Sequence, residues 1–288
     1  MLTLKLAWIV ICTSLTAILF TYFFIESRNE SVIKYFPADE KQSFESANTT
    51  LSFQSGEGND EYEIGWELSS RTPQSVYLRQ DVSLLYVNGR LKGVVNKWKE
   101  NAQEINKRST LHGEDTQKYE AISFHHGEIH KNSDTINSIQ ETSKDRLYII
   151  DSPHSNRIAF HDPQSAEEKT WKNKLDHSIN QQLEAQWDEL LTHYQIPEGA
   201  YEKIPLTELP AFDEENPFPY TSKENYKRIS GQLWEGLYKN YILGIKDTHS
   251  KHPIQSYIPL LLFDKNGKHL MVLYEDDAGE KHQLIQYY

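Results

Sequence analysis

The sequence predicts an α+β protein in which an N-terminal single transmembrane helix precedes a mostly antiparallel-sheet region. A C-terminal part of two long amphipathic helices plus a β-meander follows. Three observations support this fold class: an uncharged apolar run near the N-terminus, alternation of apolar and polar residues from residue 61, and two stretches with apolar residues every three to four positions. The predicted divisions are a short tail (1–5), a transmembrane anchor (6–25), a polar stalk (26–58), a mainly β region (59–160) and the helical pair with its meander (161–288). The last part forms either its own domain or one domain with residues 59–160.

The apolar run begins at Leu6 and ends at Ile25, and it contains no charged residue, proline or glycine. Twenty helical residues rise about 30 Å, which is the thickness of the hydrocarbon core of a bilayer. A cleaved signal peptide and a buried core helix are the alternatives, but the residues after Ile25 lack the small pair that a cleavage site needs. A short tail before one apolar run favours a single-pass cell-membrane protein whose bulk is extracytoplasmic.

Alternation begins in the β region, where Tyr62, Ile64, Trp66 and Leu68 are separated by polar residues or glycine. This period of two is typical of a half-buried strand. Asn88-Gly89 then lies between two apolar runs and predicts a hairpin, because both residues tolerate positive φ angles. Beyond that turn, the spacing of Val94, Trp98, Ala102 and Ile105 predicts a short helix over residues 96–107.

Two capping-box patterns mark the N-termini of the predicted helices, one at Ser165 with Glu168 and one at Thr221 with Glu224. Each is followed by one apolar stripe, which predicts two antiparallel helices packed against each other. The first stripe comprises Trp171, Leu175, Ile179, Leu183, Trp187, Leu190 and Tyr194, and the second comprises Tyr226, Ile229, Leu233, Leu237 and Tyr241. Three strands over residues 257–263, 269–274 and 282–288 then predict the β-meander.

Candidate metal ligands occur in the segment Ser123-Phe124-His125-His126-Gly127-Glu128-Ile129-His130. On a continuous strand, His126, Glu128 and His130 share one face, with neighbours about 6.6 Å apart. Imidazole and carboxylate groups are zinc ligands, so a bend at Gly127 would allow these side chains to converge on one ion. The alternative interpretation is a polar strand that faces solvent. No cofactor is expected otherwise, and no catalytic residue is assigned.

The composition argues against a disordered protein, a nucleic-acid-binding protein and a disulfide-rich protein. The 38% hydrophobic content supports a folded core, and a net charge of −12 is opposite to the basic surface that nucleic acid requires. One cysteine excludes a disulfide framework within the chain. We therefore expect a membrane-anchored extracytoplasmic binding or regulatory protein, non-enzymatic rather than enzymatic. Its expected partners are the membrane, through residues 6–25, and a protein or envelope component. A membrane-tethered metal-dependent hydrolase and a structural or assembly subunit of a membrane complex are the alternatives.

Overall fold

The computed structural model describes residues 33–54, 61–131, 135–152, 157–243, 256–276 and 278–288. Ile33–Tyr288 form one compact unit, and Met1–Val32 are grouped apart from it. The predicted anchor, residues 6–25, lies outside the described residues. Within the described ranges, every helix is too short or too polar to cross a bilayer.

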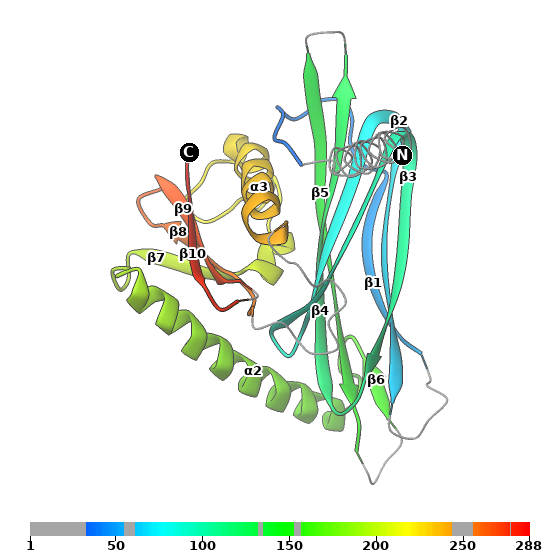
Figure 1. Ribbon diagram of the computed structural model, residues 1–288, viewed down its shortest axis with the longest axis vertical. Coiled ribbons are helices and arrows are strands. Elements are labelled where there is room, and N and C mark those ends of the chain that lie inside the picture. Colours follow the sequence, from blue (N-terminus) through cyan, green and yellow to red (C-terminus); the bar gives the residue numbers. More distant parts are fainter. Residues whose placement is uncertain (1–32, 55–60, 132–134, 153–156, 244–255, 277) are drawn as a thin grey trace, which may run out of the picture. The chain divides into compact units, whose positions relative to one another are not determined.

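The first sheet is antiparallel and contains six strands in the order β1-β2-β4-β5-β6, with β3 also paired to β2 (Figure 1). Its strands are β1 (Ser46–Gln54), β2 (Tyr62–Val87), β3 (Arg90–Gly113), β4 (Gln117–His130), β5 (Ile136–Ile150) and β6 (Ile158–Phe160).

Strand β2 divides into two halves with different neighbours. Residues 63–71 pair with β1, whereas residues 78–87 pair with β4, and the register to β3 shifts between these halves, between Arg71 and Val76. Strand β1 therefore does not continue beside β4. It packs across β4 and β5 instead, where the backbone amide of Leu51 donates to Asp145 Oδ2 at 2.7 Å.

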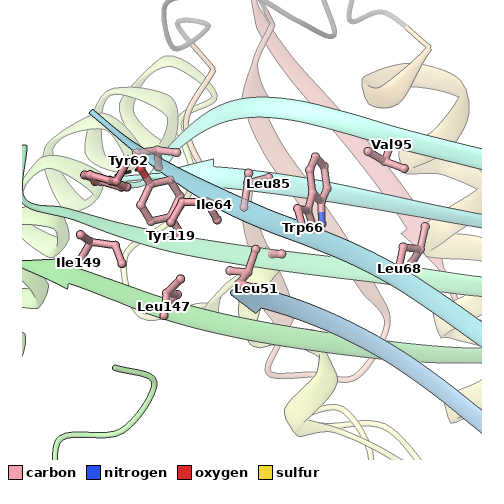
Figure 2. Close-up of a cluster of buried hydrophobic side chains, with 12 residues drawn as sticks. Leu51, Tyr62, Ile64, Trp66, Leu68, Leu85, Val95, Tyr119, Leu147 and Ile149 are labelled. Atoms are coloured by element: carbon pink, nitrogen blue, oxygen red, sulfur yellow. Dashed lines mark hydrogen bonds between the residues drawn. The ribbon is translucent and has the colours of Figure 1, made fainter. Parts of the chain in front are cut away.

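The apolar core of this sheet lies between β1 and the facing strands (Figure 2). Alternating residues of β2 point into it, as the period of two predicts. Burying such side chains contributes about 1.5–3 kcal/mol each, which is the main stabilising term for the layered arrangement. The buried members are Leu51, Tyr62, Ile64, Trp66, Leu68, Leu85, Val87, Val95, Tyr119, Ala121, Leu147 and Ile149.

The second sheet has four antiparallel strands in the order β10-β9-β8-β7. Its strands are β7 (Tyr201–Pro205), β8 (Leu260–Asp264), β9 (His269–Glu275) and β10 (Lys281–Tyr287). The described helices are α2 (Ala166–His193), the 3₁₀ helix η1 (Leu206–Ala211), α3 (Lys223–Leu237) and the π-helical turn η2 (Tyr238–Ile242). The meander of β8, β9 and β10 forms as the sequence predicts, and β7 adds a fourth strand that it does not predict.

The predicted fold class is wrong, because the chain is mostly antiparallel β, with 51% strand and 23% helix. The helix expected over residues 96–107 is part of β3. Val94, Trp98 and Ala102 recur every four residues, and a spacing of four also keeps side chains on one face of a strand. The long hairpin pairing of β3 with β2 decides between the two structures.

The predicted pair of long amphipathic helices is also wrong. The capping box at Ser165 is present, but the apolar stripe of α2 packs on sheets rather than on α3. Trp171 and Leu175 contact the cluster around Tyr148, and Leu190 packs against β8 and β9. Only Ile179, Leu183 and Leu190 of α2 are buried, and α3 has 15 residues. An apolar stripe predicts that a face is covered, and it does not identify the element that covers it.

Candidate functional site

The three candidate metal ligands lie on β4, and the structure separates one of them from the other two. His126 is buried, at 2% exposure, and both of its ring nitrogens lack a hydrogen-bond partner among the described residues. Its ring lies 6.0 Å from that of Phe124, which in turn stacks on Trp234 of α3 at 5.0 Å. Burial lowers the pKa of His126 to about 4, so the imidazole is neutral at pH 7.

Glu128 and His130 come together near the end of β4. His130 Nε2 lies 3.4 Å from Glu128 Oε2, and the His130 ring stacks on the exposed Tyr77 at a centroid distance of 3.7 Å. In the described part of the chain, no three His, Cys, Asp or Glu side chains gather closely enough to hold a metal ion. Zinc binding by His126, Glu128 and His130 therefore stays a prediction.

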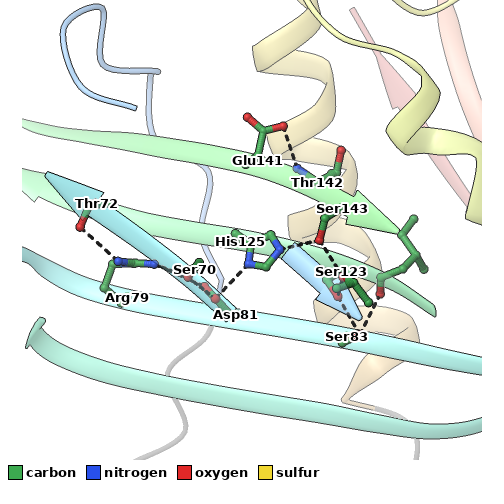
Figure 3. Close-up of polar contacts among 12 residues, drawn as sticks. Ser70, Thr72, Arg79, Asp81, Ser83, Ser123, His125, Glu141, Thr142 and Ser143 are labelled. Carbon is green, nitrogen blue, oxygen red and sulfur yellow. Dashed lines mark hydrogen bonds and ion pairs between the residues drawn. The ribbon is translucent and has the colours of Figure 1, made fainter. Parts of the chain in front are cut away.

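A buried polar network lies on the opposite face of β4 and was not predicted from the sequence (Figure 3). His125 Nδ1 donates to Asp81 Oδ2 at 2.9 Å, and His125 Nε2 lies 2.8 Å from Ser143 Oγ. Asp81 also accepts from Ser70, which accepts from Arg79. Arg79, Asp81 and His125 have no exposed surface. The sequence signal for this network was weak: Arg79 and Asp81 stand directly before the mainly apolar residues 82–87 of β2.

The network continues from Ser143 across the core to β1. Thr49 Oγ1 lies 2.6 Å from Ser143 Oγ and also contacts Ser123, which donates to Ser83 at 2.7 Å. At its other end, Arg79 donates to the Gln103 carbonyl of β3 at 2.9 Å. These contacts connect β1, β2, β3, β4 and β5 through side chains.

The order of carboxylate, imidazole and hydroxyl in Asp81, His125 and Ser143 is that of a serine-hydrolase relay. Here, however, Thr49 also contacts the Ser143 hydroxyl, and the carboxylate and imidazole are sealed inside the sheet. Buried polar groups are costly unless they are hydrogen-bonded, and this arrangement pairs most of them with one another. Asp81 Oδ1 and Arg79 Nε make no hydrogen bond among the described residues, but Arg79 Nη2 lies 3.9 Å from Asp81 Oδ1 as an ion pair. We assign the network to holding the two layers in register.

Two surface cavities lie on the other face of β5. One of about 220 Å³ is lined by ion pairs, including Lys144 with Glu208 at 2.6 Å and His161 with Asp145 at 3.0 Å. Glu120, Asp145, Asp162 and Glu208 outnumber the cations Lys144 and Arg146 in this lining.

The second cavity, of about 330 Å³, lies between β5 and α3 and is acidic. Glu141, Asp213 and Glu215 line it, with Lys227 paired to Glu214. Burial raises the pKa of Glu141, which favours the neutral carboxyl there.

Strand β3 presents the longest open edge among the described strands. It pairs with β2 on one side over almost its whole length. On its other side the described residues contribute only a contact at its start, where Arg90 bridges to Tyr257 and the Leu91 amide donates to Ser256. Most of this edge, between Asn96 and His112, is exposed or half-buried. Among the described residues, no strand pairs with this edge between Asn96 and His112.

Comparison with known proteins yields weak structural neighbours only. No family model and no curated protein matches the sequence. A glycosyl hydrolase family 2 member from Bacteroides cellulosilyticus is 11% identical with a TM-score of 0.25, over 41% of this chain and 17% of that one. A protein from Arabidopsis thaliana is 12% identical with a TM-score of 0.25, over 44% of this chain and 93% of that one. A CARDB domain from Pyrococcus furiosus, solved with di-metal ions, is 12% identical with a TM-score of 0.22, over 40% of this chain and 97% of that one. These scores assign neither a fold nor a function.

Proposed function

We propose that this chain is a membrane-anchored, extracytoplasmic binding or regulatory protein that recognises a protein partner through the open edge of β3. The anchoring part of the proposal rests on the uncharged run of residues 6–25. The binding part rests on one structural observation, the 24-residue strand β3 that has a strand neighbour on one side only within the described chain.

An open edge supports binding because alternate backbone N–H and C=O groups along it point away from the sheet. Extended segments of other proteins bind such edges by adding a strand. Strands in globular proteins usually have 3–10 residues, so β3 offers far more backbone than an ordinary edge. By contrast, His125, Ser143 and Ser70 inside the sheet already hydrogen-bond other side chains of the network.

Topology is tested with a single cysteine reporter. Cys12 is the only cysteine, and Ala278 is exposed in the turn between β9 and β10. A Cys12→Ser, Ala278→Cys protein is treated in intact cells with a membrane-impermeant thiol reagent. Labelling before lysis supports an extracytoplasmic domain. Labelling only after lysis contradicts it.

Binding through β3 is tested by site-specific photo-crosslinking in the same cells. One variant carries a photo-reactive residue in place of Asn106 on β3, and its matched control carries it in place of Lys203 on β7. Both positions are exposed and lie on edge strands. A discrete adduct from position 106 alone supports the proposal, whereas equal adducts from both positions, or none, contradict it.

A further inference from the structure

We propose that the segment bound by β3 is an extended acidic peptide, which adds to the edge as a further strand and places its carboxylates against the β3 lysines. The inference rests on the proposed function and specifies the chemistry of the partner. It is argued from the charges of β3, from the face on which they lie and from the backbone groups of the edge.

The charge of β3 is opposite in sign to that of the chain. The strand contains six basic residues and two acidic residues, whereas the whole chain has a net charge of −12. The basic residues are Arg90, Lys92, Lys97, Lys99, Lys107 and Arg108, and the acidic residues are Glu100 and Glu104. A basic strip on an acidic protein attracts an acidic ligand locally while the rest of the surface repels it.

Three of the four lysines of β3, Lys97, Lys99 and Lys107, lie on one face of the sheet. By register, Lys97 is opposite Asp81 and Lys107 is opposite Leu68, whose side chains both point toward the core. Lys99 lies on the same face, because strand side chains alternate. Glu100 and Glu104 therefore lie on the other face. The lysine charge is segregated rather than interleaved with carboxylates.

Three cations of this edge are available to a ligand. Lys97, Lys107 and Arg108 are exposed, and none of them has an acidic partner within 4.0 Å among the described residues. Lys99 donates to the carbonyl of Glu104 at 3.0 Å. Ion pairs with an incoming strand would therefore replace contacts with water rather than existing ion pairs.

Lysines on an edge strand also discourage pairing between copies of the same protein. That role alone predicts no affinity for acidic peptides and no requirement for backbone pairing. Strand addition predicts both, because the peptide must present carboxylates at alternate positions and free amides along one edge. The two explanations are separated by a peptide whose charge is kept while its amides are blocked.

The test uses the full-length chain in non-ionic detergent and fluorescently labelled 12-residue peptides, with binding followed by anisotropy. The probe alternates Thr and Glu. One comparison peptide alternates Thr and Lys, and another is the Thr-Glu peptide N-methylated at alternate amides. We expect the Thr-Glu peptide to bind, the Thr-Lys peptide not to bind, and N-methylation to weaken binding at least tenfold.

Protein variants locate the site. Lys97→Glu with Lys107→Glu should weaken binding of the Thr-Glu peptide at least tenfold, and Lys203→Glu on edge strand β7 should leave it unchanged. No binding of the Thr-Glu peptide, equal binding of its N-methylated form, or equal weakening by Lys203→Glu would overturn the inference. The peptide comparisons use the unmodified protein, so they hold even if a variant misfolds. A crosslinked adduct at position 106 together with failed peptide binding would retain the proposed function and reject the acidic partner.

Discussion

The packing between β4 and α3 includes a buried histidine, His126, whose neutral form favours the folded protein. His126 is buried beside the stacked pair of Phe124 and Trp234, without a hydrogen-bond partner for either nitrogen among the described residues. Burial is the main cause of its low pKa of about 4, and the positive charge of Arg79 acts in the same direction. The carboxylate of Asp81, the backbone of Lys34 and the carboxylate of Glu235 act in the opposite direction.

The direction in which pH changes the free energy of unfolding follows from the pKa of His126 in the folded and unfolded chain. An unfolded histidine has a pKa of about 6.5, so the unfolded chain binds a proton at a higher pH than the folded chain does. The contribution of His126 to stability is therefore fully present above pH 6.5 and is lost as the pH falls toward 4. With a folded pKa of about 4, the free energy of unfolding falls by about 2 kcal/mol at pH 5 and by about 3 kcal/mol at still lower pH.

Urea unfolding of the full-length chain in detergent, followed by tryptophan fluorescence at pH 7.5 and pH 5, measures this loss. His126→Phe keeps an aromatic ring and removes the titration, so its decrease between the two pH values should be about 2 kcal/mol smaller than that of the wild type. His177→Phe, which replaces an exposed histidine of α2, is the matched control and should behave as the wild type does. Equal decreases in the wild type and in His126→Phe would refute the reasoning.

Two further predictions concern metal and packing. If the fold needs no metal, a chelator leaves the melting temperature of the full-length chain unchanged, and a large decrease that His126→Ala abolishes would support zinc binding instead. Gly113→Ala should lower the free energy of unfolding by about 1–3 kcal/mol, because a Cβ there would lie 2.3 Å from Tyr119 Oη and 2.5 Å from Tyr62. Gly236→Ala is the matched control, since its Cβ would meet nothing within 4 Å, and it should be neutral or stabilising when both are measured by urea unfolding.

Local features of the fold could be predicted from the sequence where the signal involved neighbouring residues. Asn88 and Gly89 adopt φ angles of 49° and 80° in the predicted hairpin turn, and Ser165 forms its capping box with Glu168. The helix over residues 96–107 was predicted because the spacing of Val94, Trp98, Ala102 and Ile105 fits a helix, and only the step from Ala102 to Ile105 departs from one face of a strand. These residues form a strand because they pair with β2, and that pairing is a long-range contact.

In the candidate site, too, local sequence patterns predicted only what neighbouring residues determine. Alternation implies that His126 and Glu128 share a face of β4, but it does not reveal that His126 is enclosed beside the ring of Phe124 while Glu128 contacts His130. The network of Asp81, His125 and Ser143 depends on residues 44 and 18 positions apart. Such a cluster exists only after β2, β4 and β5 have paired, so no local pattern predicts it.

The buried network and the open edge of β3 are connected by Arg79. Its guanidinium donates to the Gln103 carbonyl, close to the point where the register between β2 and β3 shifts. Losing this carbonyl would remove an acceptor from a buried guanidinium, and a hydrogen bond to a charged group contributes about 1.5–3 kcal/mol. Because that cost penalises any slip of β2 against β3, the network fixes which residues of β3 face outward. A one-residue slip would turn the lysine face away from its present side, so the interior charges set the geometry on which the proposed binding edge depends.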